Sequence, residues 1–394
     1  MDVVQPAAAD LWRGSGLSGN LRRVAEALRV LGPSTRSDLM EATRLSRPTV
    51  STTVADLATA GLALEQVVNA SGRGGGRPAA LVRLTRSAGL AVGVDIGRRH
   101  IRVAVADLGH EILTEDAVRL VEDADDTPGP VLDLAAGMVD RALDTVGAAR
   151  TEIVAVGLGI PAPITRQGRI GAPQLLPGWS GLAPADELAG RLCVPVVVNN
   201  DANLGALGEY HWGAARGCPA LVYVKLATGI GAGIVLDGQL FIGSAGTAGE
   251  IGHVSINARG PVCRCGSRGC VELSAGGRAL VEHARLSYPD IADVSDLVRL
   301  AAEGDAGCRR LLSDAAAEIG IALSGLVNLL NPDRIVLGGE LGSATDILLE
   351  PLRRGLTDAA MPAAAGAVTV TRGELGERAV ALGGIVTALR ATTP

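Results

Sequence analysis

The chain has 394 residues, of which 47% are hydrophobic and 2% are aromatic. This length is two to three times that of an ordinary domain, so we expect at least two domains. Residues 1–88 hold 11 arginines against seven acidic residues, a charge of +4, whereas the remainder holds 25 basic against 35 acidic residues, a charge of −10. The basic part suggests an anionic partner. We identify neither a signal peptide nor an apolar run near the roughly 18–20 residues that span a bilayer, and therefore expect a cytoplasmic protein without membrane contact.

Three short helical patterns follow one another in the basic part. The first has apolar residues at helical spacing and should end at Gly32-Pro33. The second should begin at Ser34-Thr35, with Asp38 placed to accept the first-turn amides. The third should begin after Ser46, a good N-cap, and end at Gly61.

The third helix is predicted to expose short polar side chains and one arginine. Such side chains suit the major groove of DNA, where hydroxyls reach phosphates or bases and an arginine can bridge guanine. The predicted outward residues are Arg47, Thr49, Ser51, Thr52 and Thr53.

Two predicted strands, Leu62–Val68 and Ala79–Leu84, follow and are joined by a loop rich in glycine and arginine. The glycines keep the tip of this hairpin thin, so Arg73 and Arg77 could enter the minor groove. Three helices and a hairpin predict a winged helix-turn-helix DNA-binding domain over residues 1–85. The alternative is a three-helix protein-interaction module with a Gly/Arg loop.

From about residue 90 onward, strands alternate with helices. A strand over Ala91–Asp95 turns at Gly97 into a neighbouring strand, and a similar unit begins with Leu221–Leu226 and turns at Thr228-Gly229. The repetition predicts a duplicated α/β fold over residues 86–394, with two lobes that face a cleft, as in actin-like sugar kinases. Two unrelated β-meanders are the alternative.

Polar residues end another buried strand. The run Val196–Val198 is followed by Asn199, Asn200 and Asp201, which begin a helix. A carboxylate at this place can accept a hydrogen bond from a sugar hydroxyl, or act as a general base when a phosphoryl donor is near. The alternative is that Asp201 only caps the helix.

A compact set of metal-ligating side chains comes next. Its members are His253, Cys263, Cys265 and Cys270. One imidazole and three thiolates at this spacing suit a tetrahedral zinc ion better than a disulfide framework in a reducing cytoplasm. A complete set of four ligands leaves no open position, so the zinc should be structural and brace the loop that carries Glu250 and Glu272. The cysteines without ligand spacing are interpreted as core residues: Cys193, Cys218 and Cys308.

A late strand ends in Gly338-Gly339, before a helix. In a nucleotide-binding lobe such a turn lets the backbone approach adenosine, and otherwise it is only a connection between a strand and a helix. The last apolar residues of the chain should pack against the body or against a partner subunit: Leu382, Ile385, Val386 and Leu389.

Through nearly the whole chain, these motifs resemble the ROK family, named for repressors, open reading frames and kinases. The string from Glu250 through the cysteines to Glu272 is its most specific part. The resemblance implies that Asp201 is the base in members that phosphorylate sugars, and that His253 binds zinc through one ring nitrogen and faces sugar with the other. It implies the following sugar-binding residues: Asn200, Asp201, Glu250, His253 and Glu272. The N-terminal winged helix resembles the repressor branch.

The nucleotide side departs from the kinases of this family. They follow the first Asp-x-Gly with another glycine and a small residue, whereas here Asp95-Ile96-Gly97 is followed by Arg98-Arg99-His100. Long side chains hinder close approach of the backbone to phosphate, although an arginine can also bind phosphate. We interpret the nucleotide site as vestigial, with these members: Asp95, Gly97, Thr228, Gly229, Gly338 and Gly339.

The sequence therefore predicts a sugar-responsive transcriptional regulator, in the simplest case a repressor of carbohydrate genes. The expected partners are a double-stranded DNA operator, a sugar or sugar phosphate effector, and further copies of the chain in a homodimer or homotetramer. Structural Zn²⁺ is the expected cofactor, and no catalytic residue is expected. The alternative is an ATP-dependent sugar kinase with Asp201 as its base. In a third hypothesis the body docks a protein instead of a sugar.

Overall fold

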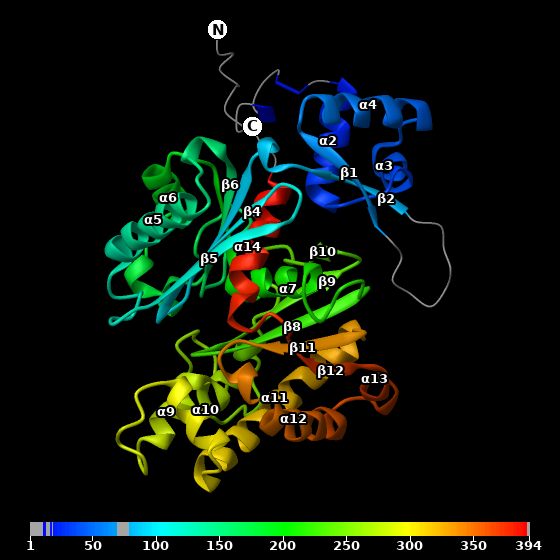
Figure 1. Ribbon diagram of the computed structural model, residues 1–394. Coiled ribbons are helices and arrows are strands. Elements are labelled where there is room, and N and C mark those ends of the chain that lie inside the picture. Colours follow the sequence, from blue (N-terminus) through cyan, green and yellow to red (C-terminus); the bar gives the residue numbers. More distant parts are fainter. Residues whose placement is uncertain (1–10, 13–15, 18, 69–78, 392–394) are drawn as a thin grey trace.

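The computed structural model describes residues 11–12, 16–17, 19–68 and 79–391. The predicted wing residues Arg73 and Arg77 lie outside the described residues. Figure 1 shows a small N-terminal part beside two larger α/β layers, with the last helix running between them. We call the N-terminal part, residues 1–85, the head.

The head contains the expected helices and hairpin. Its helices are α2 (Gly19–Leu31), α3 (Arg36–Thr43) and α4 (Arg47–Thr59), and strands β1 (Ala63–Val68) and β2 (Ala79–Leu84) pair antiparallel. All three helices pack against one another, and α2 and α3 also contact β2. The arrangement is that of a helix-turn-helix followed by two strands.

The helix caps of the head lie where the sequence places them. Thr35 and Asp38 form a reciprocal capping box at the start of α3, with each side chain accepting a hydrogen bond from the backbone amide of the other. Ser46 is the N-cap of α4, and its hydroxyl accepts from the amide of Thr49. These caps satisfy amides that a helix leaves unpaired in its first turn.

The first lobe is a five-stranded sheet in the order β5-β4-β3-β6-β7. Strand β4 pairs antiparallel with both β5 and β3, whereas β3, β6 and β7 run parallel to one another. Its strands are β3 (Leu90–Ile96), β4 (His100–Asp107), β5 (Ile112–Arg119), β6 (Ile153–Ile160) and β7 (Val196–Asn200). The helices α5 (Pro128–Thr145) and α6 (Pro184–Leu192) pack on this sheet and on each other.

The second lobe repeats this topology. Its sheet has the order β10-β9-β8-β11-β12, again with two antiparallel strands on one side and parallel pairing on the other. Its strands are β8 (Ala220–Leu226), β9 (Ile230–Leu236), β10 (Gln239–Leu240), β11 (Arg334–Gly338) and β12 (Thr369–Arg372). Its helices are α8 (Glu272–Ala275), α9 (Gly277–Ala284), α10 (Val294–Ala302), α11 (Ala306–Leu330), α12 (Thr345–Ala359) and α13 (Pro362–Ala367). The predicted duplicated fold is confirmed, and unrelated meanders are excluded.

Short 3₁₀ helices occupy several connections. They span Arg86–Ala88, Arg150–Glu152, Pro173–Leu175, Pro177–Trp179, Ile251–His253, Leu341–Ala344 and Gly376–Arg378.

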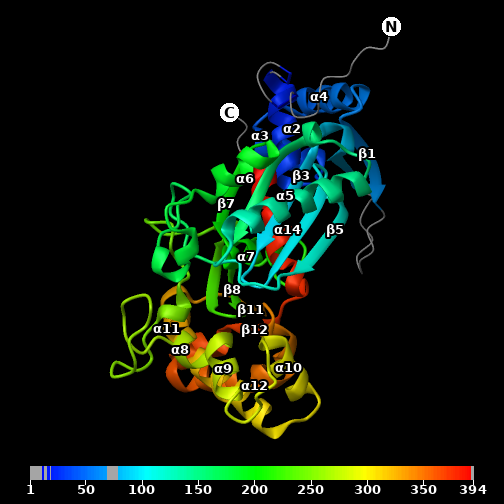
Figure 2. The same ribbon diagram turned by 90° about the vertical axis from the view of Figure 1, so that its left-hand side faces the viewer.

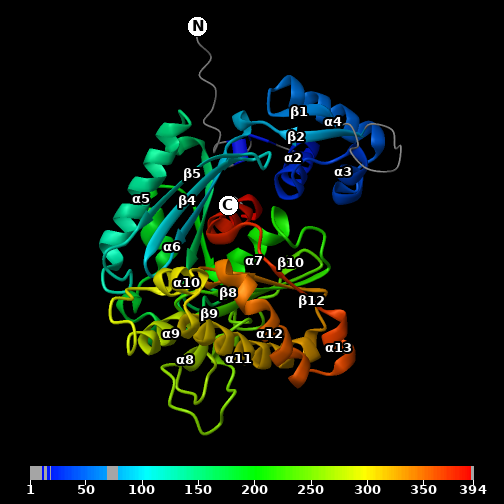
Figure 3. The same cartoon turned by 60° about the horizontal axis from the view of Figure 1, so that its bottom comes forward.

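Two helices join the lobes by crossing between their sheets. Helix α7 (Asp201–His211) leaves the first lobe and packs on β8 and β9, whereas α14 (Ala379–Arg390) leaves the second lobe and packs on β3 and β6. Figures 1 and 3 show α14 between the two sheets, beside α7. A Cβ at Gly383 would lie 1.7 Å from the carbonyl oxygen of Leu204, so this glycine lets the two helices touch. The C-terminal segment therefore packs against the body.

One expectation about the cysteines is wrong. Cys193 is exposed rather than part of the core, and it ends α6 in a left-handed conformation with φ of 59°.

Helix α11 is long and apolar enough, by length and composition, to cross a membrane. Half of its most apolar stretch is buried in the fold, where it packs along α12, and the core helix of a globular protein passes the same test.

Candidate effector cleft, metal centre and DNA-binding face

A cavity of about 100 Å³ lies between the lobes and collects residues from distant parts of the sequence. Gly97 from the turn after β3 and the Thr228-Gly229 turn after β8 line the same cavity. All five predicted sugar-binding residues line it: Asn200, Asp201, Glu250, His253 and Glu272. The structure therefore brings together the residues that the sequence assigned to sugar binding.

Asn200 and Asp201, at the start of α7, have different roles. The side-chain oxygen of Asn200 caps the helix by accepting hydrogen bonds from the amides of Ala202 and Asn203, at 2.9 and 3.3 Å. Its amide nitrogen donates to the carbonyl of Ala162. The alternative reading of Asp201 as the cap is therefore wrong, because Asn200 does this work and leaves the carboxylate of Asp201 in the cleft.

Asp201 forms a buried ion pair that sequence reasoning missed. The ammonium of Lys225, on β8, donates to Asp201 Oδ2 at 2.6 Å. Burial alone would lower the pKa of Lys225, but the charges of Asp201 and Asp95 outweigh it and raise that pKa above its ordinary value. The available signal was that Lys225 is the only lysine of the chain and stands in an apolar strand just before the Thr228-Gly229 turn.

The two glutamates of the cleft have different electrostatic environments. Burial, together with the charges of Asp201 and Glu272, raises the pKa of Glu250 to about 7. Glu272 is held by two donors, the amide of Ile230 at 3.0 Å and the guanidinium of Arg264 at 3.2 Å. Near neutral pH, Glu250 can therefore donate a hydrogen bond to a ligand or accept one from it.

Side chains of the protein itself occupy the space at the turn after β3. Asp95 is only 1% exposed, and its Oδ2 lies 2.9 Å from His100 Nε2. Burial would raise the pKa of Asp95, but His100 and Lys225 hold it below its ordinary value. The ring of His100 covers Gly97 so closely that a Cβ there would lie 2.2 Å from it. Arg98 points to Asp123, to which it donates at 2.9 Å. In a kinase this turn must admit phosphate.

The predicted nucleotide residues of the late strand are Gly338 and Gly339, and both lie close to Lys225. Gly339 lines a small cavity next to the cleft, which Asp95 and Lys225 also line. Gly338 packs against Tyr223, whose hydroxyl would lie 2.3 Å from a Cβ at this glycine. The missing side chain of Gly338 thus allows Tyr223 to pack closely against the end of β11.

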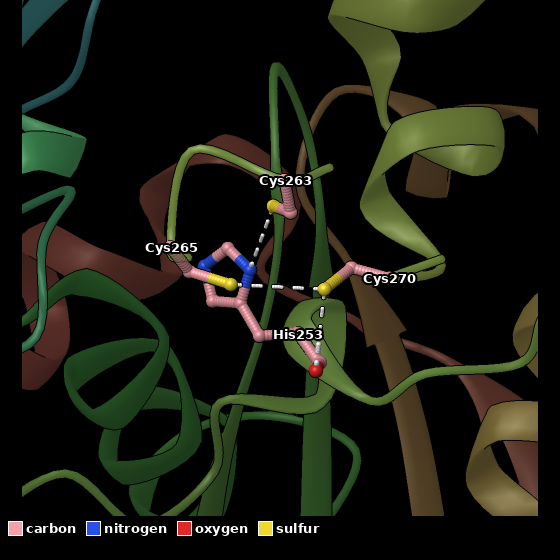
Figure 4. A group of neighbouring side chains, drawn as sticks. All are labelled: His253, Cys263, Cys265 and Cys270. Carbon is pink, nitrogen blue, oxygen red and sulfur yellow. Dashed lines mark hydrogen bonds between the residues drawn. The ribbon is translucent and has the colours of Figure 1, made fainter. Parts of the chain in front are cut away.

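The four predicted metal ligands converge (Figure 4). Their ligand atoms all lie within 4.8 Å of one another. Cys263 Sγ is 3.7 Å from His253 Nδ1, and Cys265 Sγ is 3.7 Å from Cys270 Sγ. Burial and the neighbouring thiols raise the pKa of Cys270 to about 12, so a bound cation would favour the ionised form of this thiol. One nitrogen and three sulfurs at this spacing fit a tetrahedral metal ion.

The predicted DNA-binding face of α4 is only partly as expected. Arg47 and Thr52 are exposed, and Thr49 and Ser51 are half-buried. Thr53 is buried, with 5% exposure, so its outward placement was wrong. It lies three residues after Val50, which is buried in the core of the head, and therefore shares the inner face of the helix.

The chain belongs to the ROK family, whose family model matches residues 91–391. It is 30% identical over 365 residues to the xylose repressor of Caldicellulosiruptor bescii, covering 88% of this chain and 90% of that protein. A crystal structure of a ROK family transcriptional regulator, a homologue of the E. coli Mlc protein, matches with a TM-score of 0.71 and 25% identity over 94% of this chain and 96% of that one.

Kinases of the family match the body of the chain. A ROK family glucokinase from Streptomyces griseus, in complex with glucose and AMPPNP, is 29% identical with a TM-score of 0.66. The match covers all of that enzyme but 77% of this chain. The proteins that match over almost the whole length, head included, are thus named as regulators.

Proposed function

We propose that this protein is a sugar-responsive transcriptional repressor of the ROK family. The observation that carries the proposal is the union, in one chain, of a helix-turn-helix head with a cleft where all five predicted sugar-binding residues meet. The near full-length match to a xylose repressor supports it. Because a repressor acts on DNA, the proposal includes a cytoplasmic location. Xylose is the first effector to test.

The head, residues 1–85, is proposed to bind a double-stranded operator. Helix α4 would enter the major groove with Arg47, Thr49, Ser51 and Thr52, and the wing would place Arg73 and Arg77 in the minor groove. A homodimer or homotetramer would dock two heads on half-sites about 34–36 Å apart, or a multiple of that. A small change in the separation of the heads would then prevent simultaneous docking.

The proposed cofactor is structural Zn²⁺, held by His253 Nδ1 and the three thiolates of the cluster. When bound, it supplies a fixed cross-link and no reactive position, because four protein ligands complete its shell. His253 Nδ1 faces the thiols, so Nε2 is the nitrogen left for a sugar hydroxyl. The metal would thereby orient a ring that lines the cleft.

A kinase is the second candidate, because the glucokinases match the body and the Thr228-Gly229 turn still lines the cleft. The names of the full-length relatives support the non-enzymatic role instead. The ion pair on Asp201 and the His100 ring over Gly97 support it as well. A coupled assay with ATP and a panel of sugars decides: turnover that Asp201→Asn abolishes would establish the kinase.

The central test is a gel shift with the operator in the presence of sugars. We expect an effector sugar to change operator affinity in the unmodified protein. Asp201→Asn should remove this response while the apo protein still binds DNA, because Asp201 lies in the cleft and not in the head. A matched control is Asp144→Asn, a change at an exposed aspartate of α5. Loss of response in the control, or a full response in Asp201→Asn, would contradict the assignment of the cleft.

A further inference from the structure

We propose that Lys225 is a specificity-determining residue of the effector cleft, which selects a pentopyranose over the hexopyranose that carries one more hydroxymethyl group. The inference rests on the proposed function, because it takes the cleft to be a sugar site. It goes further by naming the size class of the sugar and the residue that sets it.

The position of Lys225 puts its ammonium at the junction of the lobes. The residue lies on β8, the central strand of the second lobe, paired with Gly231 on one side and Gly338 on the other. From there its side chain reaches the first residue of α7, where it donates to Asp201 Oδ2 at 2.6 Å. Lys225 is 9% exposed and forms part of the wall of the cleft.

Asp201 is the carboxylate that would meet the terminal group of a hexose. In sugar kinases of this family the corresponding aspartate is the base, and a glucokinase must hold the hydroxyl that it phosphorylates, the one on the hydroxymethyl group, against its base. Here a donor of the chain already occupies one oxygen of that carboxylate. A charge-assisted hydrogen bond from an ammonium is stronger than one from a hydroxyl, so the sugar group does not displace it without cost.

Lys225 also has little room to move aside. Behind it lies a cavity of about 20 Å³, shared with Asp95, His100, Tyr223 and Glu340. Such a volume holds about one water molecule. Moving the ammonium away from Asp201 would separate a buried ion pair, which is strongly unfavourable. The ion pair therefore stays in place, and the sugar must fit beside it.

Lys225 bounds the cleft on the side of Asp201. A pentopyranose that binds with its ring hydroxyls on the cleft carboxylates would end beside Lys225. A hexopyranose of the same configuration would place its hydroxymethyl group on the ammonium.

The experiment compares sugars that differ only in this group, by calorimetry on the full-length, zinc-loaded protein. The pairs are D-xylose and D-glucose, L-arabinose and D-galactose, and D-lyxose and D-mannose. We expect the unmodified protein to bind the pentose of its preferred pair at least tenfold more tightly than the hexose. Equal affinities, tighter binding of the hexose, or tighter binding of a hexose 6-phosphate held by the ammonium would overturn the inference.

Variants of Lys225 assign the preference to this side chain. Lys225→Ser makes room and should reduce the pentose preference at least tenfold, whereas Lys225→Arg, which keeps a long cation, should retain it. A preference unchanged in a Lys225→Ser protein that still melts cooperatively would overturn the inference. If Lys225→Ser does not fold, a hexose that the unmodified protein binds as tightly as the matching pentose still overturns the inference. Operator binding without binding of any sugar would instead refute the sugar response itself, and this inference with it.

Because Lys225 is the only lysine, ¹⁵N-lysine labelling gives a single side-chain ammonium signal without assignment work. We expect this signal to remain hydrogen-bonded when the pentose binds. Its loss through rapid exchange with water on pentose binding would show that the ion pair opens, which contradicts the proposed selection.

Discussion

At the scale of single residues, the ion pairs of the cleft explain why similar motifs serve a regulator here. Asp95 and Asp201, the carboxylates that the resemblance relates to phosphate and sugar chemistry, each have a cationic or titratable side chain of the same protein as partner. The partners, His100 and Lys225, come from different lobes and line the same small cavity next to the cleft. The cleft therefore keeps the carboxylate of Asp201 in its wall while the ring of His100 covers the Gly97 turn.

Arg47→Ala should weaken specific operator binding by about 1–3 kcal/mol, because this exposed arginine is the strongest candidate for a contact with a base edge. Gel-shift titrations measure the change. Arg354→Ala is the matched control, since it removes an equally exposed arginine from the body. Equal affinities of Arg47→Ala and the unmodified protein would contradict the placement of α4 in the groove.

Cys265→Ser should lower the zinc content well below one ion per chain, because removal of one thiolate opens the tetrahedral set. It should also weaken sugar binding, because His253 loses its anchor. Elemental analysis and calorimetry check both results. Cys193→Ser, an exposed cysteine outside the cluster, is the control and should keep the metal. An unmodified protein that carries no metal after expression with zinc would contradict the assignment.

The residue scale also shows the limit of sequence reasoning. The His/Cys cluster could be predicted because its four members lie close together in the sequence, at a spacing typical of metal ligands. Lys225 could not, because its partner Asp201 is 24 residues away and belongs to the other lobe. Likewise, no local pattern indicates that His100 folds back over Gly97.

At the scale of elements, α7 and the turn between β4 and β5 connect the cleft with the head. Helix α7 begins at Asp201 in the cleft and ends at His211, whose ring centre is 6.2 Å from that of His110 in the β4–β5 turn. His110 Nε2 in turn donates to the carbonyl of Arg29 on α2, at 2.9 Å. Figure 2 shows α2 of the head above this region of the first lobe. The cleft and the head are thus joined by a continuous line of packed groups.

The histidine at the end of α7 predicts a loss of stability in mild acid. Burial, Arg390 and His110 lower the pKa of His211 from 6.5 to about 3. Arg390 donates to its Nε2 at 3.2 Å, which requires the neutral ring. Because the folded pKa is the lower one, the stabilisation is complete above pH 6.5 and is lost as the pH falls toward 3.

For His211 alone the loss should reach about 2 kcal/mol of unfolding free energy at pH 5. Denaturant titrations at pH 7.5 and pH 5 measure it. His211→Gln cannot take up a proton and should flatten this dependence, whereas His283→Gln, an exposed histidine on α9, should not. The same acid sensitivity in His211→Gln would contradict the role of this residue.

Elements were the most predictable level of the fold. The hairpin strand Ala79–Leu84 was predicted at its exact limits, and β8 begins only one residue before its predicted start. Apolar periodicity and turn residues act locally, which explains this success. The prediction that Thr53 faces outward was wrong because it rested on the polar hydroxyl of threonine. The methyl group of this side chain suits the interior beside Val50.

At the scale of the whole molecule, the response to sugar must obey thermodynamic reciprocity. If a sugar changes operator affinity by a given factor, the operator must change sugar affinity by the same factor, because both describe one coupling free energy. Calorimetry with and without saturating operator measures this. We expect the two factors to agree, and the coupling to shrink in Asp201→Asn. Unequal factors would indicate that sugar acts outside a common equilibrium, for example on an oligomer that dissociates.

The last helix has a consequence for how the protein is made. Strands β3 and β6 of the first lobe are covered on one face by α14, whose residues are synthesised almost 300 positions after Leu90. Until then the nascent chain exposes one face of this sheet. Nascent chains should therefore depend on chaperones late in translation, and shortened products that lack this helix should be degraded rather than compete for the operator.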